Sequence, residues 1–147
     1  MVYSKKQTMK HFLSLFAIIL VFTACNKNQN AVKKLDGNWK ATRYEVRSNG
    51  KTSDYLEIGL SFNYYFDNCK LKQNQYCQLT IDMTNDFTTT TDIKLYRVTN
   101  YGKALEFIDP LDNNNITRYT IQKLSSQTVK LKKTENNAIT FIELKKV

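Results

Sequence analysis

The sequence predicts an all-β protein, a single small antiparallel up-and-down barrel of about eight strands, preceded by a helical signal segment. Three observations lead to this fold class. After residue 35, apolar residues recur at every second position, which is the period of a half-buried strand. Short groups of Asn, Gly and Ser separate these stretches, as in turns. The 147 residues suffice for one domain. A β-sandwich is the alternative arrangement of the same strands.

Residues 1–24 are predicted to be a secretory signal peptide. Lys5, Lys6 and Lys10 precede an apolar run of 13 residues from Phe12 to Ala24. As a helix this run would be about 20 Å long, whereas the hydrocarbon core of a membrane is roughly 30 Å thick. A basic start, a short apolar segment and small residues at its end indicate a cleaved signal rather than a membrane span.

The end of this segment, "FTAC" at Phe22–Cys25, resembles the lipobox of bacterial lipoproteins. The resemblance implies a diacylglycerol on the Cys25 thiol, cleavage just before this residue, and acylation of the new N-terminus by a fatty acid such as palmitate. Two or more acyl chains anchor a protein stably, whereas a single chain binds reversibly. The alternative is an ordinary signal peptide with a chance cysteine.

Residues 25–34 are expected to form a flexible tether between the membrane and the folded domain. They are polar and show no hydrophobic periodicity. The domain itself is expected to span residues 35–147.

The cysteine count indicates one disulfide. Of three cysteines, lipidation would use Cys25 and leave Cys69 and Cys77. A hairpin with a three-residue loop at Lys72–Asn74 places these two residues opposite each other, at a Cβ separation close to that of a disulfide. A metal site is the alternative, but no histidine lies nearby to complete the ligand set.

The barrel strands follow in order along the chain. The first, around Trp39–Arg47, alternates with one slip of phase between Ala41 and Tyr44, as a β-bulge would cause. Leu60–Phe66 and Cys77–Met83 alternate without a break. Further strands are expected near residues 93–99, 104–108, 117–124, 128–132 and 140–145, separated by turns at "SNGK", "NYGK", "DPLDNNN", "SSQ" and "TENNA".

The stretch "LDGNWKATRYEV" (Leu35–Val46) resembles the opening of a lipocalin-like domain, with Leu35, Gly37 and Trp39 in a Leu-x-Gly-x-Trp motif. The segments "FDNCKLKQNQYC", "YTIQKLSSQTVKLKKT" and "ITFIELKK" resemble lipocalin-like lipoproteins of Bacteroidota. The resemblance implies a lipocalin-like barrel that binds a small apolar or lipid-like ligand in its mouth. Lipocalins often place an arginine from a late strand over the tryptophan, but here the last arginine is Arg118 and the final strand offers only lysines. We interpret Trp39 as a plug of the barrel end rather than a ligand contact.

Catalysis is not expected. The only histidine, His11, lies in the signal peptide, which excludes Ser-His-Asp and Cys-His mechanisms and His-ligated metals in the mature chain. A disulfide between Cys69 and Cys77 would leave no thiolate nucleophile. No Gly-rich phosphate-binding motif occurs among four glycines. The sequence therefore predicts neither an enzyme nor a cofactor.

Two pairs of acidic residues were weighed as further candidates for chemistry. Asp54 with Glu57 lies in a polar lead-in, and Asp109 with Asp112 lies in the "DPLDNNN" segment. That segment lacks the glycine and closing glutamate of a calcium-binding EF-hand loop, so we interpret it as a hairpin loop without a metal.

The positive charge favours an anionic membrane surface over nucleic acid as a partner. The chain carries 22 Lys+Arg and 13 Asp+Glu, a net +9, and removal of residues 1–24 with their three lysines would leave +6. The lysines are scattered and the arginines are few, unlike a nucleic-acid-binding stripe. Anionic lipid would attract such a domain within a Debye length. The lipobox implies an outer-membrane location, and the acid-free "NKNQN" after Cys25 favours its periplasmic face.

Two functions remain open at this point. One is a tethered barrel that binds a ligand; the other is a non-catalytic interaction or structural module of the envelope that uses exposed aromatics such as Tyr55, Tyr65 and Tyr101. The interior separates them, because large inward-pointing residues would either fill the barrel or line a cavity. These residues are Phe62, Tyr64, Phe66, Phe107 and Phe141.

Overall fold

The computed structural model describes residues 27–69 and 76–147. The predicted signal peptide, Cys25 and the loop Lys72–Asn74 lie outside these residues. Residues 27–35 are helical and nine strands follow: β1 (Gly37–Ser48), β2 (Lys51–Asp54), β3 (Ser61–Phe66), β4 (Cys77–Thr84), β5 (Thr89–Thr99), β6 (Ala104–Ile108), β7 (Ile116–Leu124), β8 (Thr128–Glu135) and β9 (Ala138–Lys146). Within the described residues, no helix has the length and apolar character needed to span a membrane.

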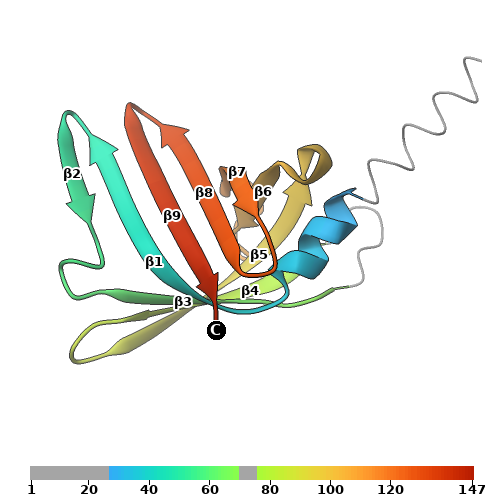
Figure 1. The fold of residues 1–147 in the computed structure, drawn as a ribbon, viewed down its shortest axis with the longest axis horizontal. Helices are drawn as coiled ribbons and strands as arrows, with labels where there is room; N and C mark the ends of the chain where they lie inside the picture. The colour runs from blue at the N-terminus through green and yellow to red at the C-terminus, as the bar shows by residue number, and fades with distance from the viewer. Residues whose placement is uncertain (1–26, 70–75) are drawn as a thin grey trace, which may run out of the picture.

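The strands form a closed antiparallel barrel, as the sequence predicts (Figure 1). Each strand from β3 to β9 pairs with the next along the chain, and β1 closes the barrel by pairing with β9 from Trp39–Lys146 to Ser48–Ala138. On its other side β1 pairs first with β3 and then with β2. Because β2 and β3 share one side of β1, nine strands occupy eight positions around the barrel. Closure by β1 and β9 leaves no long free edge.

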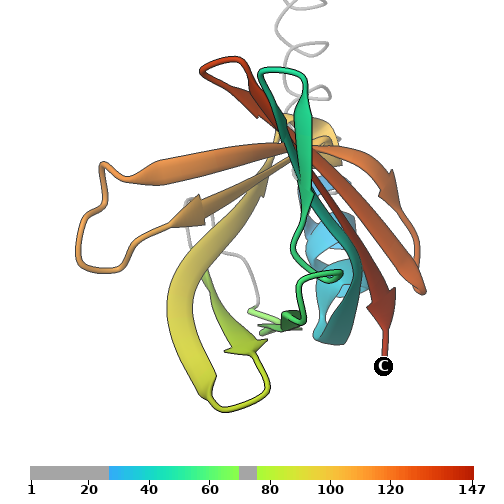
Figure 2. The ribbon, with the colours of Figure 1, turned by 90° about the vertical axis from the view of Figure 1, so that its left-hand side faces the viewer.

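The two ends of the barrel differ. The turns between β1 and β2, β4 and β5, β6 and β7, and β8 and β9 surround one end, which we call the mouth; Figure 2 looks into it. The helix of residues 27–35 lies at the opposite end, which we call the closed end (Figures 1 and 2). The start of β1, the end of β9 and the turn between β5 and β6 also lie at the closed end.

The predicted strand pattern is confirmed, with two differences. The bulge in β1 is present, because its register with β9 shifts between Ala41 and Arg43. β5 begins at Thr89, earlier than expected, because the polar run Thr89–Asp92 pairs with the end of β4. β2 was not predicted, because all four of its residues are polar and show no alternation. It forms by pairing with the far end of β1.

Residues 27–34 are not a flexible tether, contrary to the prediction for this part of 25–34. They belong to the helix, and Ala31, Val32 and Leu35 are buried in the core. These three apolar residues share one helical face, which packs against the closed end. The Asn28 side chain also accepts a hydrogen bond from the backbone N–H of Gly102 at 2.7 Å. The folded domain thus begins before residue 35.

Trp39 closes the barrel at the helix end. Its side chain is fully buried, and its Nε1–H donates to the carbonyl of Leu35 at 2.5 Å. The Nζ of Lys146 lies 5.2 Å from the Trp39 ring centroid and donates to the carbonyl of Asp36. A lysine from the last strand therefore supplies the cation that an arginine often provides in lipocalins. Gly37 allows the chain to turn here with a φ of +103°, a conformation that L-residues avoid.

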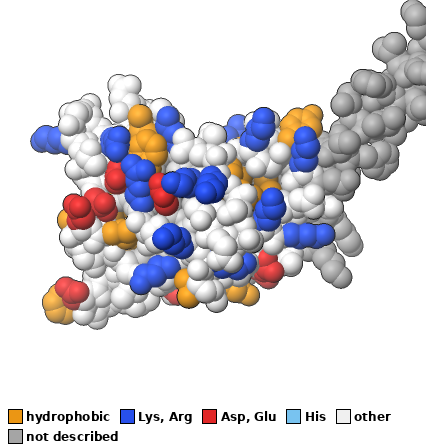
Figure 3. Space-filling view, viewed as in Figure 1, with side chains coloured by type: hydrophobic (Ala, Val, Ile, Leu, Met, Phe, Trp, Pro, Cys, Tyr) orange, Lys and Arg blue, Asp and Glu red, His pale blue; other side chains and the backbone are white. Residues whose placement is uncertain are grey.

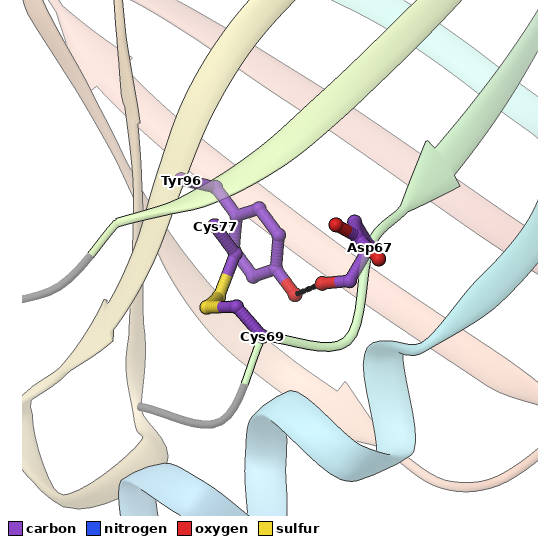
Figure 4. The surroundings of a disulfide bond; sticks show 4 residues. All are labelled: Asp67, Cys69, Cys77 and Tyr96. Atoms are coloured by element: carbon purple, nitrogen blue, oxygen red, sulfur yellow. Dashed lines mark hydrogen bonds between the residues drawn. A yellow bond between two sulfur atoms is a disulfide. The ribbon is translucent and has the colours of Figure 1, made fainter. Parts of the chain in front are cut away.

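The structure contains the predicted disulfide between Cys69 and Cys77, with a Cα–Cα distance of 5.4 Å (Figure 4). The predicted register is wrong, however. The ladder pairs Phe66 with Leu79, so β3 ends before Cys69 and the disulfide closes a loop beyond the paired strands. Beside it, the Tyr96 hydroxyl donates to the carbonyl of Asp67 at 2.8 Å. The disulfide and this hydrogen bond fix the chain that leaves β3 over the closed end.

Large side chains fill the closed half of the barrel. Phe66 and Tyr96 meet edge to face with their ring centroids 5.1 Å apart, and both are fully buried with Trp39 and Leu79. Phe141, which the sequence offered as an interior residue, points outward, because its neighbours Thr140 and Ile142 are the buried ones. The guanidinium of Arg43 lies 4.8 Å from the Phe141 ring centroid. Bulky residues therefore plug one half of the barrel and leave Phe141 on the surface.

An ion-pair network around one buried carboxylate crosses the outer face of β5, β6 and β7. Glu106 on β6 is fully buried, and the register places Arg97 and Arg118 directly opposite it. Both guanidinium groups donate to its carboxylate, the Nε of Arg118 at 2.7 Å. Burial alone would raise the pKa of Glu106, but the two arginines outweigh it and lower the pKa. Glu106 is therefore paired and does not face the barrel interior.

The helix makes a testable contribution to stability. We expect Val32→Ala to lower the free energy of unfolding by roughly 1–3 kcal/mol, because it removes buried methyl groups and leaves a small cavity. Lys33→Ala, on the exposed side of the same turn, should change it by less than about 0.5 kcal/mol. Urea denaturation of the two variants measures the difference. Equal stability of both variants would mean that the helix does not belong to the folded domain.

Candidate functional site

A cavity of about 580 Å³ occupies the mouth half of the barrel. Its walls come from the mouth ends of β1, β3, β4, β5, β6 and β7. The lining residues are Tyr44, Phe62, Tyr64, Ile81, Met83, Thr90, Thr91, Asp92, Lys94, Phe107, Asp109, Asn115, Thr117 and Tyr119. The sequence left open whether large side chains fill the barrel or line a cavity. In the structure, they fill the closed half and line a cavity in the mouth half.

Aromatic rings form much of the cavity wall. The Tyr44 and Phe62 ring centroids lie 4.6 Å apart, and those of Phe107 and Tyr119 lie 5.1 Å apart. These side chains sit on inward-facing strand positions, which β-strand geometry places at every second residue. Rings packed in pairs hold one another in place, so the wall is preformed rather than assembled by a ligand.

Three tyrosine hydroxyls come together in this wall, on Tyr44, Tyr64 and Tyr119. Burial is the main cause that raises the pKa of each, and Tyr44 and Tyr119 also raise the pKa of Tyr64, well above its usual value. Tyr64 and Tyr119 are only 3% and 7% exposed. Among the described residues, none of the three hydroxyls has a hydrogen-bond partner, and no side-chain polar atom is sealed from solvent without one. The hydroxyls therefore remain protonated donors at neutral pH and border the cavity.

One lysine and two aspartates line the outer part of the cavity. Lys94 Nζ lies 3.2 Å from Asp109 Oδ2 and 3.4 Å from Asp92 Oδ2. Burial would lower the pKa of Lys94, but its hydrogen bonds to the two carboxylates outweigh this and raise it. The pKa of Asp109 is lowered, first by the backbone N–H of Leu111 and then by Lys94. Together, Lys94, Asp92 and Asp109 carry a net charge of −1 at neutral pH.

The residues singled out in the sequence lie mostly away from this cavity. Gly37, Trp39, Cys69 and Cys77 belong to the closed end, and Cys25 lies outside the described residues. Trp39 is a plug, as interpreted, since it is fully buried and does not line the cavity.

The two acidic pairs divide between a turn and the cavity. Asp54 caps a turn by accepting from the backbone N–H of Leu56 at 2.9 Å. Asp112 likewise accepts from the N–H of Asn114 at 3.0 Å, as a hairpin loop requires. Asp109 has a second role, because it lines the cavity and binds Lys94. Across the described ranges, no group of three or more His, Cys, Asp or Glu residues is placed to hold a metal ion.

Sequence reasoning missed the polar part of the cavity. Thr90, Asp92 and Lys94 alternate along β5 and point inward, although the usual signal of an inward position is an apolar residue. The alternation of Asp92 and Lys94 with Ile93 and Leu95 was the available clue, but here the polar residues face inward, opposite to the expected pattern. Tyr44 was assigned to its strand but not to a site.

A comparison with solved structures identifies the fold. The chain resembles a lipocalin-like protein from Bacteroides uniformis ATCC 8492, with a TM-score of 0.50 and 16% sequence identity over 78% of this chain and 99% of that one. No protein-family model matches the sequence, and no curated protein does. At this level of identity the resemblance shows a lipocalin-like barrel fold, as the sequence predicts.

The contrast between tyrosines with and without a partner can be tested by removing single hydroxyls. We expect Tyr96→Phe to lower the free energy of unfolding by about 1 kcal/mol, because the fully buried Tyr96 side chain loses its hydrogen bond to the carbonyl of Asp67. Tyr64→Phe should change it by less than about 0.5 kcal/mol, because no described residue bonds to its hydroxyl. Urea denaturation measures both. A Tyr64→Phe variant as unstable as Tyr96→Phe would show that the Tyr64 hydroxyl has a structural partner.

Proposed function

We propose that this protein binds a small apolar or lipid-like molecule in the mouth of its barrel. The observation that carries the proposal is the cavity of about 580 Å³ between an aromatic wall and a polar rim. Cavities of roughly 300–1,000 Å³, mostly apolar with a few placed polar groups, are typical of small-molecule sites. The lipocalin-like fold supports a ligand-binding role, and the absence of histidine after residue 11 supports a role without catalysis.

We also propose that lipid on Cys25 tethers the protein to the bacterial outer membrane, with the periplasmic face favoured. The distribution of charge supports an orientation in which the closed end faces anionic lipid. Of the eight exposed lysines in the described ranges, Lys51 lies at the mouth, and seven lie toward the closed end, at Lys27, Lys33, Lys34, Lys40, Lys103, Lys123 and Lys145. Of the six exposed acids in the described ranges, Asp67 lies at the closed end, and five lie around the mouth, at Glu57, Asp86, Asp92, Asp112 and Glu135. In Figure 3 most of the visible acidic side chains lie on the left, which is the mouth side.

This orientation has a consequence for the ligand. Cys25 precedes the helix by two residues in the sequence, so a lipid on Cys25 would attach the protein through its closed end. Attraction between lysines and anionic lipid acts within about 10 Å and would hold the closed end to the surface. The mouth would then open away from the membrane and take its ligand from the surrounding compartment.

An interaction module is the second candidate, and the surface around the mouth favours it. Three large apolar side chains at loop positions are mostly exposed: Ile58 is 71% exposed, Phe87 92% and Leu111 97%. By contrast, Tyr55, which the sequence offered as an exposed contact, is half buried against Tyr44 at a ring-centroid distance of 5.1 Å. A protein partner at the mouth would contact the three loop residues rather than Tyr55.

Filling the cavity tests the ligand-binding proposal. We expect Thr117→Trp, which adds a large ring to the cavity wall, to weaken binding of N-phenyl-1-naphthylamine at least about tenfold by occupying its space. Thr120→Trp, on the exposed outer face of the same strand, is the matched control and should bind normally. Fluorescence titration gives both dissociation constants. Equal binding by both variants would place the probe outside the cavity.

The anchor is tested by Cys25→Ala. The wild-type protein should incorporate tagged palmitate, and its mature mass should correspond to a chain that begins at Cys25 plus lipid. The variant should incorporate none, because no thiol remains to accept the diacylglycerol. Lys27→Ala, two residues further on, should be lipidated normally. Palmitate incorporation by Cys25→Ala would make the lipobox interpretation wrong.

A further inference from the structure

We infer that the ligand is an uncharged or cationic ring-containing molecule with a hydrogen-bond acceptor, which the hydroxyls of Tyr44, Tyr64 and Tyr119 bind inside the barrel. This inference rests on the proposed ligand-binding function and narrows it from lipid-like molecules in general to one chemical class.

The first argument is the supply of donors in the cavity. Tyr64 and Tyr119 are more than nine-tenths buried, and their hydroxyls and that of Tyr44 have no hydrogen-bond partner among the described residues. The hydroxyls are not sealed from solvent, so a ligand that displaces water from the cavity must offer them an acceptor or leave them unpaired, which costs free energy. Three hydroxyls on one wall therefore match a ligand with a carbonyl, ether or hydroxyl oxygen. A saturated hydrocarbon chain would leave all three without a partner.

The second argument is the charge at the outer part of the cavity. Asp92 and Asp109 hold the ammonium of Lys94 between them at 3.4 and 3.2 Å, so Lys94 is already paired. The carboxylate of a fatty acid entering here would approach two aspartates and one lysine, and that lysine is already paired with the aspartates. Like charges at this range repel, whereas a cation or a neutral group meets no such cost. An anionic headgroup is therefore disfavoured.

The third argument is the shape of the wall. Phe62 and Phe107 complete a wall of five aromatic rings with the three tyrosines, and four of these rings form two packed pairs. Flat ring faces contact a planar or ring-shaped body over more area than they contact a flexible chain, and the ring loses less conformational freedom on binding. The aromatic wall, the hydroxyl donors and the negative charge therefore favour the same class of ligand.

Three naphthalene probes of equal ring size test these properties separately. They are 2-acetylnaphthalene, which carries a carbonyl acceptor, 2-ethylnaphthalene, which carries none, and 2-naphthoate, which carries a negative charge. Each is titrated against bound N-phenyl-1-naphthylamine with the full mature protein. In the variant with Tyr64→Phe and Tyr119→Phe, binding of 2-acetylnaphthalene should weaken roughly three- to tenfold, because a hydrogen bond is lost. Binding of 2-ethylnaphthalene should change less than about twofold.

The charge is tested on a second variant. The wild-type protein should bind 2-naphthoate more weakly than 2-acetylnaphthalene, and Asp92→Asn with Asp109→Asn should reverse or remove that preference. Thermal unfolding and circular dichroism confirm that each variant is folded, and Thr120→Trp serves as a surface control.

Each outcome decides the inference. Equal weakening of the carbonyl and hydrocarbon probes, or tightest wild-type binding by 2-naphthoate, overturns it. If N-phenyl-1-naphthylamine binds in the cavity but none of the three probes displaces it, the inference fails while the ligand-binding function stands. If N-phenyl-1-naphthylamine does not bind the wild-type protein at all, the proposed function fails and the inference fails with it.

Discussion

Pairing between the first and last barrel strands is the constraint on which the rest of the structure depends. β1 and β9 pair along β1 from Trp39 to Ser48, and this single ladder turns a meander into a closed barrel. Closure gives the chain an inside, so that alternate side chains of every strand face one another. The bulge between Ala41 and Arg43 lies in this ladder and changes the phase of β1, which brings Tyr44 inward after Ala41.

The side chains inside the barrel differ between the closed end and the mouth. At the closed end, Trp39 donates a hydrogen bond to the last residue of the helix, and the ammonium of Lys146 lies over its ring. The disulfide fixes the neighbouring loop. Packing there resembles the core of any small domain. At the mouth the same strands carry tyrosines, threonines and charged residues around an open volume. The stable end therefore supports a mouth whose residues are available for a ligand.

The sequence predicted the barrel well because period-2 patterns report the position of side chains on strands directly. It placed β1 with its bulge, located β6 at its observed bounds and paired Cys69 with Cys77. It failed where tertiary contacts decide the structure. β2 is polar throughout and forms only beside β1, and the helix of residues 27–35 has a single apolar face that is stabilised by the closed end. The sequence did not predict the cavity, because Asp92 and Lys94 are polar residues at inward positions.

A barrel with a plugged base and a polar, aromatic mouth accounts for the placement of rings, hydroxyls and charges in one scheme. Its central claim is that the mouth holds a small molecule. Native mass spectrometry of the protein purified from its own host tests this claim most directly. The account predicts one small molecule bound per chain, released by mild activation, and lost in a variant whose cavity is filled. An empty barrel that instead carries a protein partner would contradict it.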